Sequence, residues 1–165
     1  MQAGFLYAFR REYDVAVQFD GDGQHVAKEI NKLLEPIAAD RADLVIGSRF
    51  LSPGGYRAPL FRKMGIAIFS FTLSRILGMT VTDSTSGFRA ANKRVIEFFS
   101  HTYPDDYPEV EALVLLHKIG MRMEEVDTRM RERTGGTSSI TPIRSIYYMT
   151  KVLMAIFIDL LKKAR

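Results

Sequence analysis

The feature that most constrains this chain is a pair of aspartates, Asp20 and Asp22, set one residue apart at the end of a short apolar run. The run, residues 15–19, is rich in strand-forming residues, and residues 24–37 have the apolar spacing of a helix. Open α/β sheets bind their ligands beyond the carboxyl ends of their strands. The pattern therefore predicts an α/β domain with a polar site at that edge of its sheet.

Two carboxylates on a turn after a strand can both reach a hard divalent cation. Mg²⁺ and Mn²⁺ held in this way keep positions open for substrate phosphates. Gly21 and Gly23 leave room for the close approach of a diphosphate and a sugar. The alternative interpretation of Asp20 and Asp22 is a pair of surface carboxylates or helix caps.

Composition excludes several classes of protein. The 165 residues are 47% hydrophobic and 25% charged, as expected for one globular domain with a real core. The absence of cysteine excludes disulfides, thiolate zinc sites and cysteine nucleophiles. The net charge of +4 suits phosphates, an anionic membrane surface or nucleic acid alike. Nucleic acid is not expected as a partner, because the chain has no aromatic-interleaved basic face and no known reader motif.

Helices and strands are expected to alternate along the chain. Residues 3–10 have the pattern of the last turns of a helix, and no signal peptide is expected at the start. The later expected elements are a buried parallel strand at 44–47, a helix at 60–77 ended by Gly78, a strand at 88–91, helices at 93–99 and 110–119, and a strand at 121–126. The uncharged part of the helix at 60–77 is too short to span a bilayer.

Two further groups of polar residues lie in the middle of the chain. Residues 83–89 combine Asp83, three hydroxyls, a glycine and Arg89 before a strand, which suits the wall of a polar pocket or a capped turn. Glu109 and Glu111 stand at the start of a helix, where acids are also favoured by the helix dipole.

A third group lies at residues 131–139. It places arginines beside a glycine pair and hydroxyls, which is typical of a mobile phosphate clamp or of a solvated charged loop.

These motifs occur in a characteristic order. D-x-D-x-Q-H is followed by G-S-R, then by D-S-x-S-G-F-R and by R-x-R-x-G-G-x-S. Over nearly the whole chain this order resembles family 2 glycosyltransferases with the GT-A fold. The resemblance is to polyprenyl-phosphate sugar transferases related to dolichyl-phosphate mannose synthase, and to bacterial surface-polysaccharide transferases. The implied fold is an α/β domain of the Rossmann-like GT-A type, with a mostly parallel sheet flanked by helices.

The resemblance implies a role for each group. The metal, Mg²⁺ or Mn²⁺, is expected on Asp20, Asp22 and Gln24. The residues implied to bind substrate are Asp20, Arg49, Arg62, Arg89, Arg133, Gly136 and Ser138, with Arg49 on the acceptor side and Arg133 on a loop that closes over the phosphates. The acids expected to take part in catalysis are Glu109, Glu111 and Asp83.

The implied reaction is an inverting transfer of a sugar from a nucleotide-sugar donor to a polyprenyl-phosphate or saccharide acceptor. The metal would stabilise the charge on the departing nucleoside diphosphate. Glu109 or Glu111 is the candidate base for a hydroxyl acceptor. A phosphate acceptor is already anionic and needs little base.

The chain departs from the family before Asp20. The Pro-x-Tyr-Asn-Glu-like motif that ends the family's first strand is missing, and so is the following unit that holds the nucleotide base. Residues 1–140 are therefore expected to form a partial GT-A domain that lacks its N-terminal nucleotide-binding part. The alternative is a non-catalytic remnant that serves as a binding or interaction module.

The last part of the chain, residues 141–165, is expected to form an amphipathic helix. Its apolar stretch is interrupted by Lys151 and Asp159 and ends in a basic cluster, which favours a helix lying in a membrane interface over one that spans it. The alternatives are a helix packed on the protein's own core and a homodimer contact. The expected location is cytoplasmic, peripheral at the inner face of the membrane.

Overall fold

The computed structural model describes residues 1–21, 23–51, 60–104, 108–131, 151 and 154. Its centre is a sheet of β1 (Val15–Gln18), β2 (Leu44–Ser48), β3 (Arg89–Asn92) and β4 (Met123–Asp127), in the order β1-β3-β2-β4. β3 pairs antiparallel with both β1 and β2, whereas β2 and β4 are parallel. β1, β2 and β4 therefore run in one direction and β3 runs against them.

The predicted α/β fold is confirmed. The strand predicted at 44–47 is a buried strand that pairs in parallel with β4. The antiparallel direction of β3 was not anticipated and makes the sheet mixed. It arises because α3 and the loop after it bring the chain back to the carboxyl edge of β2, so that the next strand must begin at that edge.

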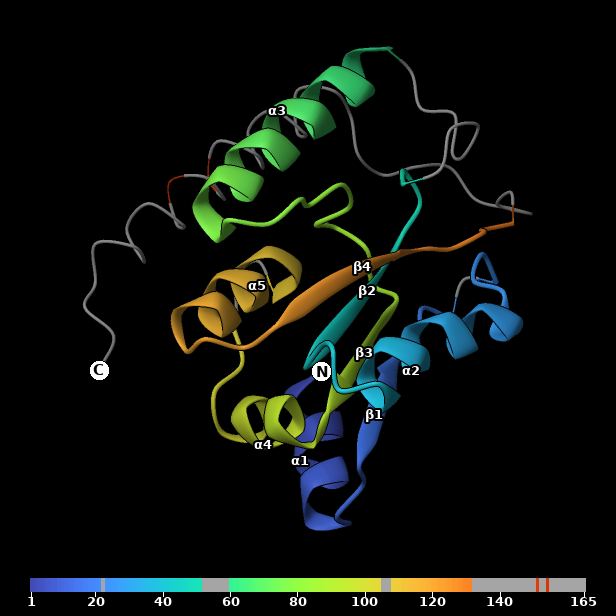
Figure 1. Cartoon of the computed structure of the whole chain (residues 1–165), viewed down its shortest axis with the longest axis vertical. Helices are drawn as coiled ribbons and strands as arrows, with labels where there is room; N and C mark the ends of the chain where they lie inside the picture. Colours follow the sequence, from blue (N-terminus) through green and yellow to red (C-terminus); the bar gives the residue numbers. More distant parts are fainter. Residues whose placement is uncertain (22, 52–59, 105–107, 132–150, 152–153, 155–165) are drawn as a thin grey trace.

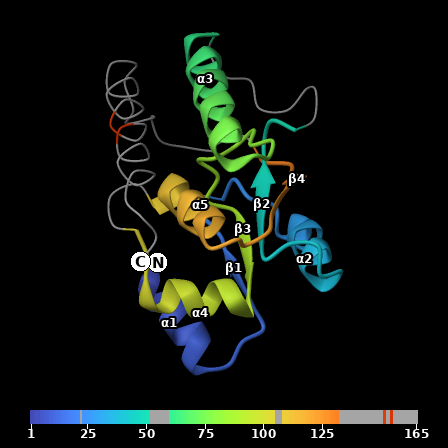
Figure 2. The same cartoon turned by 60° about the vertical axis from the view of Figure 1, so that its left-hand side comes forward.

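Helices cover both faces of this sheet, as Figures 1 and 2 show. The helical elements are α1 (Gln2–Arg10), the short 3₁₀ turn η1 (Ala27–Glu29), α2 (Ile30–Ala38), α3 (Leu60–Leu77), α4 (Lys93–His101) and α5 (Pro108–Lys118). α2 lies on one face, and α1, α4 and α5 lie on the other, with α3 above them in Figure 1.

Alternation along β2 explains these two layers. Leu44 and Ile46 belong to the large core shared with α1, α3, α4 and α5, whereas Val45 faces the smaller core under α2. Successive side chains of a strand point to opposite faces, so an uninterrupted apolar run indicates a strand that is covered on both sides. All five residues of β2 are buried.

Local signals set several helix boundaries. Gly78 follows α3 with a φ of +63°, a conformation that glycine adopts without strain. Asn92 precedes α4, and its side-chain oxygen accepts a hydrogen bond from the backbone N–H of Val95. The helix predicted from residue 24 begins later, as a 3₁₀ turn at Ala27.

A buried carboxylate ties three strands together at the edge opposite to the predicted site. Asp43 is 0% exposed and accepts hydrogen bonds from the backbone N–H of Arg122 at 2.8 Å and from Asn92 Nδ2 at 2.8 Å. The guanidinium groups of Arg122 and Arg94 also contact it. These contacts join the residues before β2 and β4 to the end of β3.

Candidate functional site

Three of the predicted site residues, Asp20, Arg49 and Asp83, lie at the carboxyl edge of β1, β2 and β4. Asp20 follows β1 and Arg49 follows β2. The loop of residues 82–88 reaches the same edge because β3 begins there. Segments that are far apart in the sequence therefore meet at one edge of the sheet (Figure 1).

The Asp20 carboxylate lies directly against Gly87. A Cβ atom added to Gly87 would overlap Oδ2 of Asp20 and stand 2.6 Å from its Oδ1. The Asp20 carboxylate can therefore occupy its present position only because residue 87 has no side chain. The first motif and the D-S-x-S-G-F-R motif are thus in contact.

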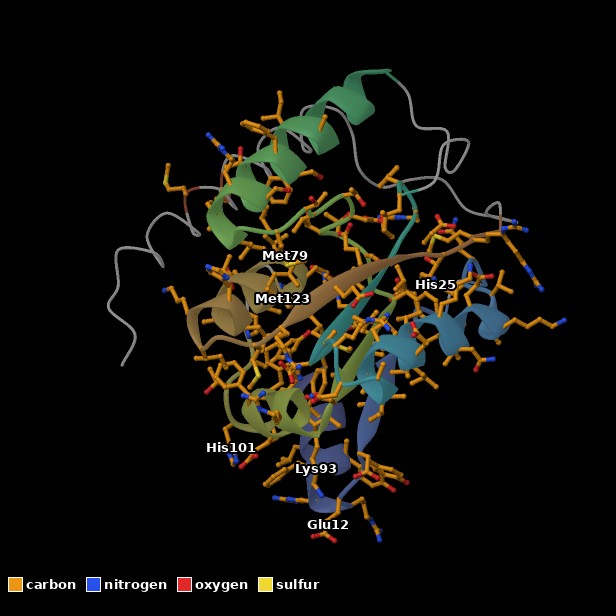
Figure 3. The ribbon with its side chains drawn as sticks, viewed as in Figure 1. Glu12, His25, Met79, Lys93, His101 and Met123 are labelled. Atoms are coloured by element: carbon orange, nitrogen blue, oxygen red, sulfur yellow. The ribbon has the colours of Figure 1, made fainter. Side chains whose placement is uncertain are left out.

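The imidazole of His25 contacts the Asp20 carboxylate. Its Nε2 is 3.4 Å from Asp20 Oδ2, and its ring is buried against Phe88 and Phe19, with centroids 4.7 and 5.4 Å away. Figure 3 shows His25 well separated from Glu12, Lys93 and His101, which lie around α1 and α4. The Nδ1 atom of His25 is buried and has no hydrogen-bond partner within the described residues.

Arg49 and Asp83 form a two-pronged ion pair. Arg49 Nε donates to Asp83 Oδ2 at 2.6 Å and Nη2 donates to Oδ1 at 2.7 Å. The backbone N–H of Arg49 also donates to Oδ2, and Nη2 reaches Thr85 Oγ1 at 3.2 Å. The Asp83 side chain is 1% exposed and that of Arg49 is 20% exposed. The pair therefore fixes the position of the Arg49 guanidinium at the edge of the site.

The sequence did not indicate a further acid that binds the backbone at Asp83. Glu125, on β4, accepts hydrogen bonds from the backbone N–H and the hydroxyl of Thr82 and from the backbone N–H of Asp83. Thr82 Oγ1 also lies 2.6 Å from Ser48 Oγ. Burial raises the pKa of Glu125, and the hydrogen bonds from Thr82 and Asp83 oppose that rise. The alternating character of the strand at 121–126 was the only signal that Glu125 faces another layer.

Arg89 lies inside the protein and does not reach into solvent. The whole residue is 5% exposed. Its guanidinium donates hydrogen bonds to the backbone oxygens of Ser86 at 2.8 Å and Ser84 at 2.9 Å. Burial lowers the pKa of Arg89, and the charge of Glu109 at the start of α5 acts in the opposite direction. In this structure Arg89 supports the loop of residues 84–86 and is not open to a substrate.

The remaining predicted site residues are placed only in part. Gln24 lies in the loop before α2, and its backbone oxygen accepts a hydrogen bond from the N–H of Arg131 at 2.8 Å. Glu109 and Glu111 are half-buried in the first turn of α5. Asp22, the side chain of Arg62, and Arg133, Gly136 and Ser138 lie outside the described residues, as does most of the predicted C-terminal helix.

The described donors suit a divalent cation that borrows ligands from its substrate. The Asp20 side chain is 52% exposed and offers carboxylate oxygens, which Mg²⁺ and Mn²⁺ prefer. No group of three His, Asp or Glu side chains that could hold a metal by itself occurs within the described residues. A cation at Asp20 would therefore need further oxygens, such as those of Asp22 or of phosphates.

Within the part of the chain that the structure describes, no helix is both long enough and apolar enough to cross a bilayer.

Sugar transferases that act on polyprenyl or dolichyl phosphates are among the known proteins to which the chain is similar. The chain is 36% identical over 126 residues to a protein of Methanococcus voltae named UDP-N-acetylglucosamine–dolichyl-phosphate N-acetylglucosaminyltransferase, covering 74% of this chain and 50% of the relative. It is 40% identical over 96 residues to a polyprenol monophosphomannose synthase of Mycolicibacterium smegmatis, covering 58% and 36%. It is 35% identical over 144 residues to an undecaprenyl-phosphate mannosyltransferase of Micrococcus luteus, covering 84% and 58%.

These relatives confirm the resemblance that the motifs indicated. No family model matches the chain. The chain spans about half the length of the curated relatives it matches, between 36% and 58%.

Proposed function

We propose, from the premise that the chain is a homologue of the family 2 polyprenyl-phosphate glycosyltransferases, that it carries the diphosphate and acceptor sides of such an enzyme. The proposed reaction moves a sugar from a nucleotide-sugar donor to a polyprenyl phosphate, with inversion at the anomeric carbon. A saccharide hydroxyl is the second candidate acceptor.

The contact between Asp20 and Gly87 is the observation that carries this proposal. It brings the aspartate motif onto the loop that also holds Asp83, and Asp83 in turn holds Arg49. A carboxylate able to share a cation with a diphosphate and an arginine able to bind an acceptor phosphate thus lie at one edge of the sheet. This is the edge at which α/β proteins bind their ligands.

Asp20, Asp22 and Gln24 are the residues proposed to hold Mg²⁺ or Mn²⁺. When bound, the cation would stabilise the negative charge on the departing nucleoside diphosphate as a Lewis acid. Gly87 leaves the Asp20 carboxylate free to stand at the edge, and His25 holds one of its oxygens. The protein's own contribution at this point is therefore the orientation of Asp20.

Arg49 is proposed to bind the phosphate of the acceptor. Both prongs of its contact with Asp83 restrict the guanidinium to one plane, and an arginine held in this way binds phosphate with little loss of side-chain freedom. Because the Asp83 carboxylate is occupied by Arg49, it suits a positioning role better than that of a proton acceptor. Arg62, Arg133, Gly136 and Ser138 remain candidates from the sequence for the other phosphate contacts.

Substitution of the acids at the start of α5 distinguishes between the two candidate acceptors. Changing Glu109 or Glu111 singly to glutamine is expected to lower turnover by about 10²-fold or more with a hydroxyl acceptor, the usual effect of removing a general base. With a polyprenyl phosphate, turnover should change little, because that acceptor is already ionised. Steady-state rates with both acceptors provide the measurement. Equal losses with both would show that these acids serve the helix and not the proton transfer.

Gly87 offers a test of the Asp20 position that is independent of fold stability. Gly87→Ala is expected to displace the exposed Asp20 carboxylate at little cost in stability, because the end of a flexible side chain can move. Nucleotide-sugar binding in the presence of Mn²⁺, followed by calorimetry, should then weaken about tenfold or more, as expected when a charge-assisted contact is lost.

Gly47→Ala is the matched control. A Cβ atom at Gly47 would meet the buried side chains of Phe88 at 2.9 Å and Thr128 at 3.0 Å. We expect this variant to lose about 1–3 kcal/mol of unfolding free energy, as overpacked cores do. If Gly87→Ala kept the melting temperature of the unaltered protein and still bound the nucleotide-sugar equally tightly, the displaced Asp20 carboxylate would not be a ligand.

The association with membranes is proposed from the sequence of residues 141–165. Their apolar stretch and basic end suit a helix lying at the cytoplasmic face, where a lipid-linked acceptor would be found. A homodimer contact is the alternative, and flotation with anionic liposomes distinguishes the two.

The proposed reaction is tested by direct assay. The purified chain is incubated with Mn²⁺ or Mg²⁺, a series of radiolabelled UDP- and GDP-sugars, and a short polyprenyl phosphate. Transfer of label to the lipid phase that requires both the metal and Asp20 supports the proposal. Metal-dependent binding of a nucleotide-sugar without transfer would favour the alternative of a binding module.

A further inference from the structure

Glu125 is a buried acid to which the proposed reaction gives no part. Its Oε2 accepts the backbone N–H of Thr82 at 2.8 Å and the hydroxyl of Thr82 at 2.6 Å, and its Oε1 accepts the backbone N–H of Asp83 at 3.0 Å. One carboxylate on β4 therefore binds two consecutive residues of the loop after α3. Ser70 Oγ donates to the backbone oxygen of Thr82 at 3.2 Å, and the three bonds to Glu125 hold the N–H side of the same segment.

We propose that Glu125 is a positioning residue for Arg49, acting through the backbone of Thr82 and Asp83. The inference rests on the proposed function, in which Arg49 binds the acceptor phosphate. The two-pronged contact with Arg49 requires the Asp83 carboxylate to lie in the plane of the guanidinium, at 2.6 and 2.7 Å. A short side chain such as aspartate can hold that plane only if its own backbone is fixed.

The hydrogen bonds of Glu125, and not its charge, favour a carboxylate at this position. The charge of Asp83 is close enough to raise the pKa of Glu125, so the two carboxylates repel each other. Charge alone would favour a neutral residue at position 125. A glutamine there matches the shape of Glu125 but has only one acceptor oxygen, and its NH₂ group would face an N–H or O–H donor of the loop. Glu125→Gln therefore removes part of the contact while relieving the repulsion.

Glu124 provides a matched control on the same strand. It is the preceding residue, its side chain is 35% exposed, and it pairs with Arg41 at 3.2 Å, away from the loop of residues 82–88. Glu124→Gln makes the same chemical change one position earlier. It should affect neither Arg49 nor the site.

The first readout is hydrogen exchange at Arg49 Nε, measured by NMR on the ¹⁵N-labelled chain. The resonance is assigned by its loss in Arg49→Lys. In the unaltered protein the Nε proton is held by Asp83, so its exchange should be slow. In Glu125→Gln we expect exchange to be about tenfold faster or more, as for the loss of a hydrogen bond to a charged group. Glu124→Gln should match the unaltered protein.

A second variant covers the case in which Glu125→Gln does not fold. Of the three contacts that Glu125 makes, Thr82→Val removes the hydroxyl contact and leaves both backbone contacts. It also removes the contact between Thr82 Oγ1 and Ser48 Oγ, so Ser48→Ala is measured beside it to separate the two. Thr82→Val should speed exchange at Arg49 in the same direction but by less. If Glu125→Gln folds and exchange at Arg49 Nε is unchanged in it, the inference is overturned. If Glu125→Gln does not fold, unchanged exchange in Thr82→Val overturns it.

Kinetics separate this inference from the proposed function. In Glu125→Gln the KM for polyprenyl phosphate should rise about tenfold while the KM for the nucleotide-sugar stays unchanged, because only Arg49 is released. Equal rises in both KM values would indicate a general structural role and overturn the inference. If no variant or parent protein transfers sugar, the proposed function fails, and the exchange measurement still decides the link between Glu125 and Arg49.

Discussion

Replacing Asp20 with alanine is expected to lower the rate of sugar transfer by about 10²–10³-fold, because charge stabilisation by a bound metal contributes several kcal/mol to such reactions. The fold should be retained. The side chain is 52% exposed and lies at the edge of the sheet, so its removal leaves no buried cavity. Initial rates at saturating metal, together with a melting curve, provide the measurement.

Asp14→Ala is the matched control for this substitution. Asp14 is an exposed aspartate that immediately precedes β1, whereas Asp20 follows it, so the two lie at opposite ends of the same strand. The control should transfer sugar at the normal rate. Full activity in Asp20→Ala would remove Asp20 from the proposed metal site. A comparable loss in Asp14→Ala would point to damage of β1 instead.

The largest expected effect on stability is that of Asp43→Ala. The carboxylate is buried between the guanidinium of Arg122, the amide of Asn92 and the guanidinium of Arg94. The substitution leaves the backbone N–H of Arg122 and the side-chain amide of Asn92 without their acceptor, at about 1–3 kcal/mol for each donor that stays buried and unpaired. The side chains of Arg122 and Arg94 are 45% and 60% exposed, so their guanidinium groups can turn to water. Unfolding by urea, followed by circular dichroism, should show this loss as a lower midpoint.

Asp40→Ala serves as its control, since Asp40 also pairs with Arg122. Its side chain is 88% exposed and its carboxylate lies 2.6 Å from Arg122 Nη2. An exposed pair of this kind contributes about 1 kcal/mol or less. If Asp43→Ala destabilised the chain no more than Asp40→Ala, the contacts around Asp43 would not hold the three strands together.

The lowered pKa of Asp43 predicts how the free energy of unfolding depends on pH. Burial opposes its ionisation, but the hydrogen bonds from Arg122 and Asn92 outweigh that effect and lower the pKa of Asp43 from 3.8 to about 2. A carboxyl group with a lowered pKa stabilises the fold above its unfolded pKa. Its contribution, at most about 2 kcal/mol, is lost as the pH falls from about 4 to about 2. Asp43→Ala should flatten this part of the curve of unfolding free energy against pH.

Several elements of the fold follow from the sequence alone. The runs at 15–19 and 44–47 are strands, and the helix at 60–77 ends at Gly78 as predicted. Each of these depends on signals within one segment: the period of the apolar residues, the preference of branched residues for strands, and a glycine that adopts a positive φ. The order of the four motifs likewise indicated the family that the relatives confirm.

The arrangement of the site was decided by tertiary structure. Nothing near Asp20 in the sequence indicates that its carboxylate lies on Gly87, and nothing near Glu125 indicates that it binds Thr82. Both contacts arise because β3 runs antiparallel between β1 and β2, which brings the loop before it to the carboxyl edge of its neighbours. The sequence determined the local elements because their signals act over a few residues. The contact of Asp20 with Gly87 and the contacts of Glu125 with the loop of residues 82–88 depend on strand order and direction. These are set only when distant segments pack against one another.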